Sequence, residues 1–399
     1  MSDKRIKVLF FHHGGNQGGA PRSLAFLIDH MDKMKYDPYV LCCLDFEDNK
    51  KLFESVAAKI LYAPKMGAWH GSTVSGMSPG MLYFNMRHVI PTYFGIAKIM
   101  REVNPDIVHL NSTCLAFAAK AIRKHYSEIP IVCHVREPLL DGIWGDILRK
   151  LNDSSVDHYI AIEKYDADSL HTQLPVDIIY NFVDFKIYNT DVKSECLRNE
   201  LGISKKDFLM LYLARISPEN GALEMLKSIL PLLKRRKDIH LCLVGATPDN
   251  RTQYLIDVEE LCVGMENIHI LPFRKDVPQV IASSDIMLVP FQQPHFARSV
   301  IEASAMGVPS VASNIGGITE LVLDQKTGLL FDYHSFAGLI EQCELLADNV
   351  EYRNELGRNA VEFAHEYFDA VKNTIRTCEV YDRVLAMKRG NTYAKKSKK

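Results

Sequence analysis

The alternation of short apolar runs with amphipathic segments constrains the fold of this chain more than any other feature. Two series of such runs occur, one beginning at residues 6–11 and the other at residues 208–213. The runs are apolar almost throughout, as in strands of a sheet that is covered on both faces. Strands that alternate with helices form parallel, doubly wound sheets. The sequence therefore predicts the α/β class, with two doubly wound Rossmann-like domains facing a central cleft where a ligand binds.

Length and charge agree with this organisation. The 399 residues suffice for two domains of ordinary size, and the formal net charge of −2 argues against a nucleic-acid partner. The nine cysteines show no metal-ligand spacing, which favours free thiols in a reducing compartment. We find no signal peptide and no apolar run of about eighteen residues, so a cytoplasmic protein is expected.

The segment 283–332 carries the strongest functional signal. It predicts a strand ending at Pro290, a polar loop, a helix with Glu302, a second strand, and a turn at Gly316-Gly317 before another helix. These special residues gather at one end of the predicted strands, where open parallel sheets bind ligands. The segment therefore has the form of half a nucleotide site. Attraction to the helix dipole is an alternative explanation of Glu302, which lies near the start of its predicted helix.

Two further loops follow predicted strands. Residues 14–19 are rich in glycine and precede a helix, whose free N–H groups favour an anion. Asp45, at the end of the next strand, keeps a dinucleotide site open as an alternative, although the loop lacks Gly-x-Gly-x-x-Gly. Arg215 follows the first strand of the second domain, where a guanidinium can clamp a diphosphate through two hydrogen bonds. A surface salt bridge is the alternative for Arg215.

Together these residues resemble a known family. The order of segments 214–221, 296–303, 316–320 and 327–330 is similar to the donor-binding half of the family 4 glycosyltransferases, which are retaining GT-B enzymes. The loop ending Gly18-Gly19-Ala20-Pro21-Arg22 resembles the first loop of their N-terminal domain. The resemblance implies a hexosyltransferase that moves a sugar from a nucleoside-diphosphate sugar to a saccharide or lipid-linked saccharide acceptor. It places the protein in cell-surface polysaccharide or glycolipid synthesis.

The resemblance also implies roles for single residues. Catalytic roles fall to His134, Arg215 and Glu302, of which Glu302 matches a glutamate that binds ribose. A buried structural histidine remains the alternative for His134. The implied donor-binding residues are Gly18, Gly19, Arg215, Asn220, Arg274, His295, Phe296, Ala297, Arg298, Ser299 and Glu302. No metal and no cofactor besides the donor substrate is implied, with UDP or GDP as the nucleotide.

Two positions near the chemistry depart from the family pattern. Pro294 stands where the first of two glutamates is expected, and Asn220 stands where a lysine helps to hold the diphosphate. Arg298 is a candidate to offset the lost cation. These departures leave open a catalytically impaired protein that binds or scaffolds another transferase, and a sugar-nucleotide epimerase. In the family's front-face mechanism the leaving diphosphate takes the acceptor's proton, which makes a carboxylate at position 294 less essential.

The same patterns predict domain boundaries and partners. We expect an N-terminal acceptor-side domain at residues 1–184 and a nucleotide-sugar domain at 185–370. By resemblance, a helix at 371–388 packs back across the domain junction. The basic residues 389–399 predict a disordered tail, or alternatively a peripheral contact with an anionic membrane. Residues 64–96, rich in methionine, aromatics, glycine and proline, predict a binding surface or lid, or a packed connection with its own helix.

One pair of aspartates has a spacing that is typical of metal sites. Asp166 and Asp168 have the Asp-x-Asp spacing of metal-dependent transferases, but they fall in a helical stretch. Because side chains two residues apart on a helix point in different directions, we predict no metal site there.

Overall fold

The chain forms two compact units. The computed structural model describes residues 5–13, 19–42, 47–56, 58–63, 66–72, 78–247 and 251–396. Unit 1 consists of Met1–Asn181 with Ala370–Lys399, and unit 2 consists of Phe182–Asp369.

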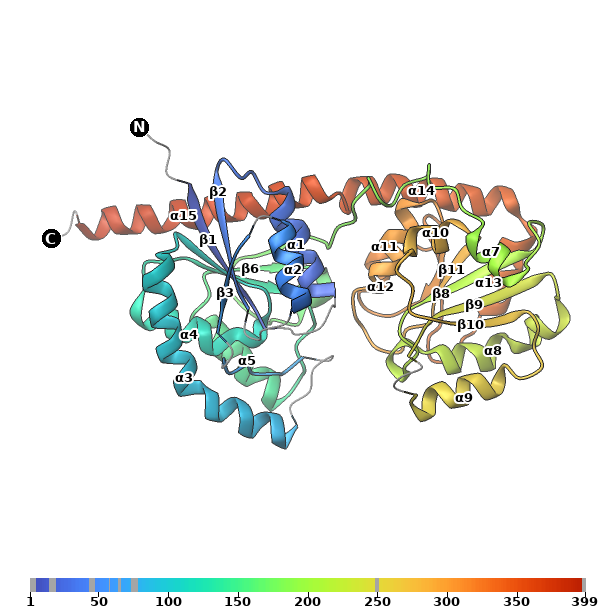
Figure 1. The fold of residues 1–399 in the computed structure, drawn as a ribbon, viewed down its shortest axis with the longest axis horizontal. Coiled ribbons are helices and arrows are strands. Elements are labelled where there is room, and N and C mark those ends of the chain that lie inside the picture. Colours follow the sequence, from blue (N-terminus) through green and yellow to red (C-terminus); the bar gives the residue numbers. More distant parts are fainter. Residues whose placement is uncertain are drawn as a thin grey trace. The chain divides into compact units, whose positions relative to one another are not determined.

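Unit 1 is built on a parallel sheet with the strand order β3-β2-β1-β4-β5-β6-β7. Helices cover its apolar strands (Figure 1). The strands are β1 (Ile6–His12), β2 (Tyr36–Cys42), β3 (Lys59–Tyr62), β4 (Ile107–Leu110), β5 (Ile131–Val135), β6 (His158–Ala161) and β7 (Val176–Ile178). The helices are α1 (Gly19–His30), α2 (Glu47–Ser55), α3 (Pro79–Val103), η1 (Thr113–Leu115), α4 (Ala116–His125), α5 (Ile143–Asp153), α6 (Lys164–Asp168) and α15 (Ala370–Lys396).

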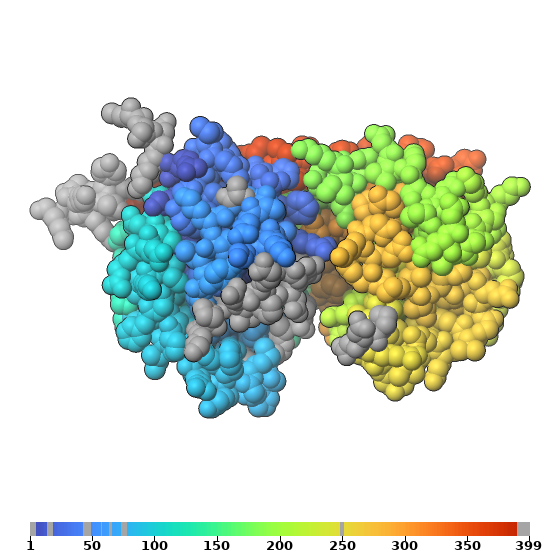
Figure 2. Space-filling view, in the orientation of Figure 1, coloured from blue at the N-terminus to red at the C-terminus, as the bar shows by residue number. Residues whose placement is uncertain are grey.

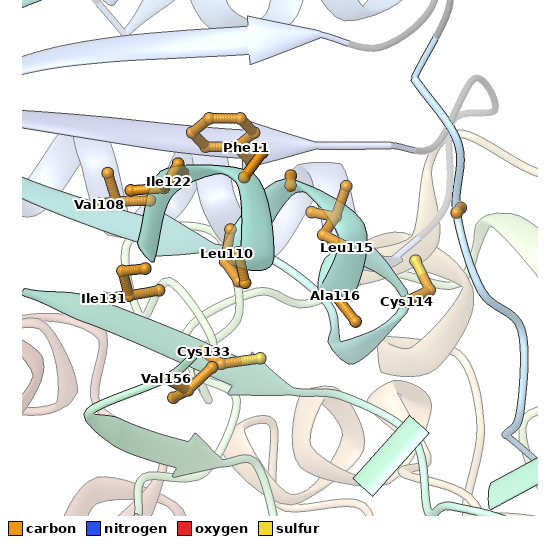
Figure 3. Close-up of a cluster of buried hydrophobic side chains, with 14 of the residues drawn as sticks. Phe11, Val108, Leu110, Cys114, Leu115, Ala116, Ile122, Ile131, Cys133 and Val156 are labelled. Carbon is orange, nitrogen blue, oxygen red and sulfur yellow. The ribbon is translucent and has the colours of Figure 1, made fainter. Parts of the chain in front are cut away.

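The main core cluster of unit 1 lies between this sheet and helices that include α3, α4 and α5. Figure 3 shows Phe11 of β1, Val108 and Leu110 of β4, and Ile122 of α4 pointing into one cluster. These four side chains are fully buried. Their burial fixes the strand ends from which the polar residues of this unit project.

Unit 2 has a second parallel sheet, with the order β10-β9-β8-β11-β12-β13. Its strands are β8 (Phe208–Leu213), β9 (Ile239–Ala246), β10 (Ile268–Pro272), β11 (Ile286–Val289), β12 (Ser310–Ser313) and β13 (Gly328–Phe331). Its helices are α7 (Cys196–Leu201), η2 (Pro218–Asn220), α8 (Ala222–Arg235), α9 (Gln253–Leu261), α10 (Val277–Ala282), α11 (Arg298–Ala305), α12 (Ile318–Leu321), α13 (Leu339–Asp348) and α14 (Val350–Tyr367). The two parallel sheets confirm the predicted α/β class and its doubly wound organisation.

The backbone enters and leaves unit 2 at adjacent positions. The Val183 N–H donates to the Phe368 carbonyl at 2.9 Å, and Val183 forms a parallel bridge with Asp369. In unit 1, the Asn373 side-chain amide donates to the Tyr180 carbonyl at 3.0 Å. The last helix, α15, therefore returns the chain to unit 1. It continues to Lys396, so residues 389–396 are helical where the sequence predicts a disordered tail.

Helix α3 occupies much of the stretch 64–96. The Ser78 side chain caps it by accepting the Met81 N–H at 3.2 Å, and Asn104 ends it in the left-handed conformation with φ of 48°. The alternative of a connection with its own helix is thus seen, and one side of that helix is exposed. Within the described residues, no helix is both long and apolar enough to cross a membrane.

Candidate functional site

The sheet of unit 2 has a topological switch point between β8 and β11. These strands are hydrogen-bonded neighbours, while β9 and β10 continue on one side and β12 and β13 on the other. Open α/β sheets bind ligands at the carboxyl ends of such a strand pair. The loops that leave this pair are residues 214–221, called here the Arg215 loop, and residues 290–297, called the Pro290 loop.

Backbone contacts join the two loops. The Gln292 N–H donates to the Glu219 carbonyl at 2.9 Å. Gly221 has a φ of 68°, and a Cβ at that position would lie 1.9 Å from the Pro290 carbonyl oxygen. Glycine alone tolerates both the conformation and the approach. The Arg215 loop and the Pro290 loop therefore hold each other in place.

The Arg215 loop presents its arginine to solvent. The Arg215 carbonyl accepts the Asn220 side-chain amide at 2.8 Å and the Tyr212 hydroxyl at 2.9 Å. The Arg215 guanidinium is exposed and makes no hydrogen bond or ion pair with any residue in the described part of the chain. The surface salt bridge weighed for Arg215 is thus not seen there. Asn220 is 7% exposed, so the residue at the family's lysine position supports the backbone of Arg215.

Glu302 and Arg298 form an ion pair on α11. Arg298 Nε donates to Glu302 Oε1 at 3.1 Å, and Glu302 is 8% exposed. Helix α11 begins at Arg298 and has no acidic residue in its first turn. A helix dipole acts mainly within the first turn, so the dipole explanation of Glu302 is wrong. Arg298 supplies the compensating charge instead, and its Nη2 also donates to the Phe182 carbonyl at 3.4 Å.

His295 is held inside the Pro290 loop. Its ring stacks on Phe291 with centroids 4.2 Å apart, and its Nδ1 lies 3.0 Å from the Gln293 carbonyl oxygen. Burial lowers the pKa of His295 below its ordinary value, so the ring is neutral at pH 7. The other predicted residues at this loop and the start of α11 are Phe296, Ala297 and Ser299, of which Ala297 is buried.

Arg274 is occupied by carboxylates. Its Nε and Nη2 donate to Asp276 at 2.9 and 2.7 Å, and its Nη1 donates to Glu200 at 2.8 Å. These contacts leave the guanidinium little capacity for a ligand. A nucleobase contact at this position would therefore fall to the backbone, as the family resemblance implies.

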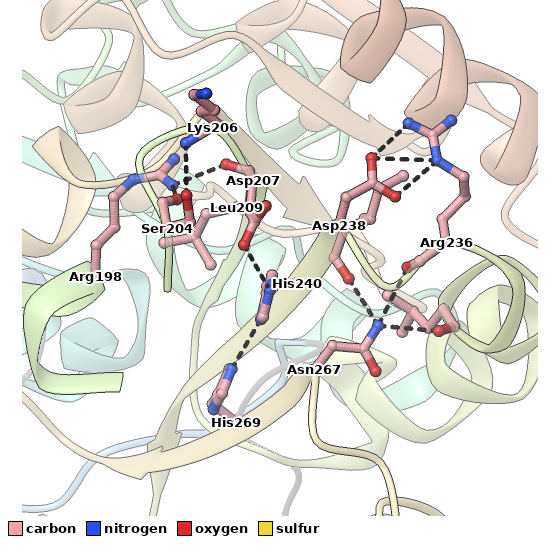
Figure 4. Close-up of polar contacts among 12 residues, drawn as sticks. Arg198, Ser204, Lys206, Asp207, Leu209, Arg236, Asp238, His240, Asn267 and His269 are labelled. Atoms are coloured by element: carbon pink, nitrogen blue, oxygen red, sulfur yellow. Dashed lines mark hydrogen bonds and ion pairs between the residues drawn. The ribbon is translucent and has the colours of Figure 1, made fainter. Parts of the chain in front are cut away.

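Two polar side chains at the amino ends of unit 2 strands make contacts within the protein (Figure 4). Asp238 directly precedes β9 and pairs with Arg236 at 2.8 Å. Asn267 directly precedes β10, and its side-chain amide donates to three backbone carbonyls at 2.8 to 3.3 Å. Arg215, at the carboxyl ends, has no such partner among the described residues, so its guanidinium is available to an anionic ligand.

In unit 1, the predicted catalytic residue His134 belongs to a buried cluster. Tyr381, His109, His134 and Arg136 are called here the histidine network. The Tyr381 hydroxyl lies 2.7 Å from His109 Nδ1, and His109 Nε2 lies 3.3 Å from His134 Nδ1. Burial and then the Arg136 charge lower the pKa of His109 to about 3. Burial, Arg136 and His109 also lower the pKa of His134 well below its ordinary value, so both rings are neutral at pH 7.

Arg136 connects the histidine network to the switch point of the unit 1 sheet, between β1 and β4. Its Nε and Nη2 donate to Asn111 Oδ1 at 2.9 and 2.7 Å, immediately after β4. Asn111 Nδ2 in turn lies 3.2 Å from Nδ1 of His12, the last residue of β1, and donates to the Ala20 carbonyl at 3.3 Å. The polar side chains at the carboxyl ends of these strands therefore form one connected set with the first turn of α1.

The glycine-rich loop lies only partly within the described residues, and the Asp-x-Asp pair lies wholly within them. Gly19 begins α1, next to Ala20, whereas Gly18 and Asp45 lie outside the described residues. Asp166 is buried, whereas Asp168 is exposed and pairs with Lys164 at 3.1 Å, so the two carboxylates do not converge. In the described part of the chain, no group of three or more potential ligands that could hold a metal ion occurs.

Four residues of this connected set were not predicted from the sequence: His109, Asn111, Arg136 and Tyr381. Polar residues that follow buried strands were a usable signal for Asn111 and Arg136. Tyr381 lies 272 positions from its partner His109, so no local pattern could have revealed it.

Two family models match the chain. One, described as Glycosyltransferase Family 4, matches residues 17–186, and the other, described as Glycosyl transferases group 1, matches residues 193–363. The chain belongs to the family 4 glycosyltransferases. Its two doubly wound units have the GT-B fold, and the protein is a glycosyltransferase.

Relatives of this glycosyltransferase differ in how much of their length they share with it. N-acetyl-alpha-D-glucosaminyl L-malate synthase of Bacillus anthracis is 25% identical over 73% of the chain and 78% of the relative. D-inositol 3-phosphate glycosyltransferase of Corynebacterium glutamicum is 30% identical over 51% of the chain, which spans only half of that relative. A Campylobacter jejuni N,N'-diacetylbacillosaminyl-diphospho-undecaprenol alpha-1,3-N-acetylgalactosaminyltransferase is 25% identical over 74% of the chain and 82% of the relative.

Among solved structures, the fold is similar to that of Anabaena HepE in complex with UDP. The TM-score is 0.79 at 21% identity, over 95% of this chain and all of that one. This likeness supports the fold assignment.

Proposed function

We propose that this glycosyltransferase moves a hexose from a nucleoside-diphosphate sugar to a hydroxyl of a saccharide or lipid-linked saccharide, with retention of configuration. The observation that carries the proposal is the exposed, unpaired guanidinium of Arg215 at the switch point of unit 2. Its backbone is held by Asn220 and Tyr212, and a guanidinium in this position suits bidentate binding of a diphosphate. The UDP complex of Anabaena HepE, a protein of similar fold, supports a nucleotide in this type of site.

In the proposed reaction, the bond between the anomeric carbon and the diphosphate oxygen breaks while the acceptor oxygen bonds to that carbon from the same face. The departing diphosphate oxygen takes the acceptor's proton. Arg215 offsets the negative charge that grows on the diphosphate, which is the electrostatic contribution that usually dominates catalysis. No carboxylate at position 294 takes part, so Pro294 is compatible with the scheme.

Donor binding can be tested by thermal unfolding with UDP, GDP or ADP and their sugars. A ligand at one hundred times its Kd stabilises the folded state by about 2.7 kcal/mol, or about 5–11 °C at about 2–4 °C per kcal/mol for a unit of this size. We expect UDP or GDP to give the shift and Arg215→Ala to abolish most of it. Arg235→Ala is the matched control, because Arg235 is an exposed arginine on α8 paired with Glu344. Equal shifts in both variants would contradict the proposed site.

Turnover separates the enzyme from a scaffold. We expect the purified chain to release nucleoside diphosphate in the presence of a saccharide acceptor and to give a product with the donor's anomeric configuration by NMR. Tight donor binding with no turnover across a broad acceptor panel would instead support the impaired, scaffolding protein. Conversion of the donor without any acceptor would reveal an epimerase.

We also propose that α3 rests on an anionic lipid surface, which would bring a lipid-linked acceptor to unit 1. One stripe of the helix, spaced by three or four residues, holds Tyr83, Ile90 and Phe94, which are 68–71% exposed. The same stripe holds the basic residues Arg87, Lys98 and Arg101, and the only acidic residue of α3 is Glu102 near its end. An exposed apolar stripe with cations and almost no acids suits a membrane interface. Figure 2 shows the light-blue atoms of this region at the surface of unit 1.

Vesicle flotation tests this contact. We expect the protein to float with phosphatidylglycerol vesicles and much less with phosphatidylcholine vesicles, because each basic residue near anionic lipid contributes about 1 kcal/mol. The triple variant Tyr83→Ser, Ile90→Ser, Phe94→Ser should lose binding. The control variant Val263→Ser, Phe273→Ser changes apolar residues that are 80% and 62% exposed in unit 2 and should retain it. Unchanged flotation of the triple variant would refute the membrane contact. A triple variant that loses self-association of the protein, and not its binding to vesicles, would refute it as well.

A further inference from the structure

The histidine network contains rings whose proton positions follow from their partners. Tyr381 projects from α15, and in the described part of the chain its hydroxyl pairs with His109 Nδ1 alone, at 2.7 Å. A buried hydroxyl left without an acceptor costs free energy. The Tyr381 O–H therefore donates to His109 Nδ1, which must be unprotonated.

The next proton position follows from the first. A neutral imidazole has one N–H, so neutral His109 carries its proton on Nε2. That atom lies 3.3 Å from His134 Nδ1 and donates to it. His134 Nδ1 is thus an acceptor, and neutral His134 carries its own proton on Nε2.

Arg136 dictates the same arrangement from the other end. Its Nη2 lies 3.5 Å from His134 Nδ1, and a guanidinium can only donate. The reverse order of protons would set an Nδ1–H of His134 against this N–H and would leave the Tyr381 hydroxyl without an acceptor. Two donors at opposite ends of the network therefore select one tautomer for each ring.

His134 Nε2 is the open end of the network. This atom is buried and has no hydrogen-bond partner among the described residues. A buried, unpartnered N–H is ready to donate to a ligand oxygen.

We propose that Tyr381, His109 and Arg136 are positioning residues that lock His134 in the Nε2–H tautomer, so that His134 serves the sugar substrate as a hydrogen-bond donor and not as a base. The action on a substrate rests on the proposed glycosyl transfer, but the tautomer does not. The residue that begins the lock comes from the last helix of the chain.

Nitrogen-15 NMR of the full chain, labelled at histidine, reads the tautomers directly at neutral pH. His109→Gln and His134→Gln identify the two sets of signals. We expect both rings to be neutral with the proton on Nε2 in the wild-type protein. A wild-type His134 that carries its proton on Nδ1, or that is an imidazolium, would overturn the proposal without any variant or substrate.

Tyr381→Phe removes the donor that begins the lock, whereas Arg136 still faces His134 Nδ1. We therefore expect the Nδ1–H tautomer to become populated in His109 and, to a smaller extent, in His134. Tyr36→Phe is the matched control, because Tyr36 is equally buried, packs on Tyr381, and bonds to Asp382 on the same helix at 3.3 Å. The control should lower the melting temperature but leave both rings unchanged. In a transfer assay, Tyr381→Phe should lower kcat about tenfold, the equivalent of one hydrogen bond, while Tyr36→Phe stays within twofold. If both rings carry the proton on Nε2 but the protein transfers no sugar, the proposed function is refuted and the tautomer assignment stands. If Tyr381→Phe and Tyr36→Phe give identical spectra, the role of Tyr381 in selecting the tautomer is refuted.

Discussion

Replacing Gly221 by alanine should damage unit 2 more than its backbone conformation alone explains. Gly221 and Gly202 have nearly the same conformation, with φ of 68° in both and ψ of 21° and 25°. They differ in what an added Cβ would meet. At Gly221 it would lie 1.9 Å from the Pro290 carbonyl oxygen, whereas at Gly202 no atom lies within 4 Å.

The two variants separate the cost of the backbone conformation from the cost of the steric clash with Pro290. An alanine in the left-handed region costs about 1–2 kcal/mol, which is the full cost expected for Gly202→Ala. The collision at Gly221 adds about 1–3 kcal/mol, as for other overpacked sites, for a total of about 2–5 kcal/mol. At about 2–4 °C per kcal/mol, the melting temperature should fall by about 2–8 °C for Gly202→Ala and by about 4–20 °C for Gly221→Ala.

Calorimetry and urea unfolding of the two variants measure this difference. We also expect Gly221→Ala to weaken nucleotide binding, because the Pro290 loop must move away from the Arg215 loop, whereas Gly202→Ala should leave it unchanged. Equal losses of stability in the two variants would refute the idea that close approach of the loops requires the glycine.

Three further predictions concern single side chains. Asp285→Ala should lower the free energy of unfolding by about 2–3 kcal/mol in urea titrations, because Asp285 accepts from Arg198 at 2.5 Å and from the Leu209 N–H at 2.8 Å. A loss below about 0.5 kcal/mol would contradict this expectation. Asn220→Ala should cost about 1 kcal/mol and raise the nucleotide Kd in calorimetric titrations, whereas an unchanged Kd would show that Arg215 needs no such support. Burial and, to a smaller extent, the charge of His70 lower the pKa of His13 to about 4. As the pH falls, His13 therefore binds a proton near pH 6.5 in the unfolded chain but only near pH 4 in the folded chain. The free energy of unfolding falls as the pH drops through this window. Between pH 7 and pH 5 the loss from His13 is about 2 kcal/mol, and His13→Gln should flatten the urea-derived pH profile by that amount.

Much of the fold could be predicted because it depends on local patterns. The apolar runs in the sequence predicted β1, β8 and β11. Because Arg215 follows one of these runs, its position near the carboxyl end of β8 was predicted correctly. The sequence could not show that Asn220 faces inward to the carbonyl of Arg215, because a turn's side-chain contacts depend on its conformation.

Other features depend on contacts between distant segments. Glu302 was expected near a helix start, but α11 already begins at Arg298, which places Glu302 beyond the first turn. Helix ends are uncertain by a few residues in any sequence-based prediction. The carboxylates around Arg274 come from α7 and from its own loop. The residues of the histidine network come from β4, from β5 and the residue after it, and from α15. No periodicity in the sequence carries that information.

The return of the chain through α15 has a consequence for biosynthesis. A ribosome makes the seven strands of the first sheet early, yet Tyr381 and the rest of α15 emerge only after all of unit 2 has been synthesised. Domains usually fold in the order in which they are made, but here the earlier unit must wait for residues 370–399, which are made after unit 2. Until then Tyr36, which is 1% exposed in the finished protein and packs against Tyr381, lacks its partner on α15. A nascent chain released before residue 370 would therefore be a substrate for chaperones or proteases, and its unit 1 would lack the group that orients His109.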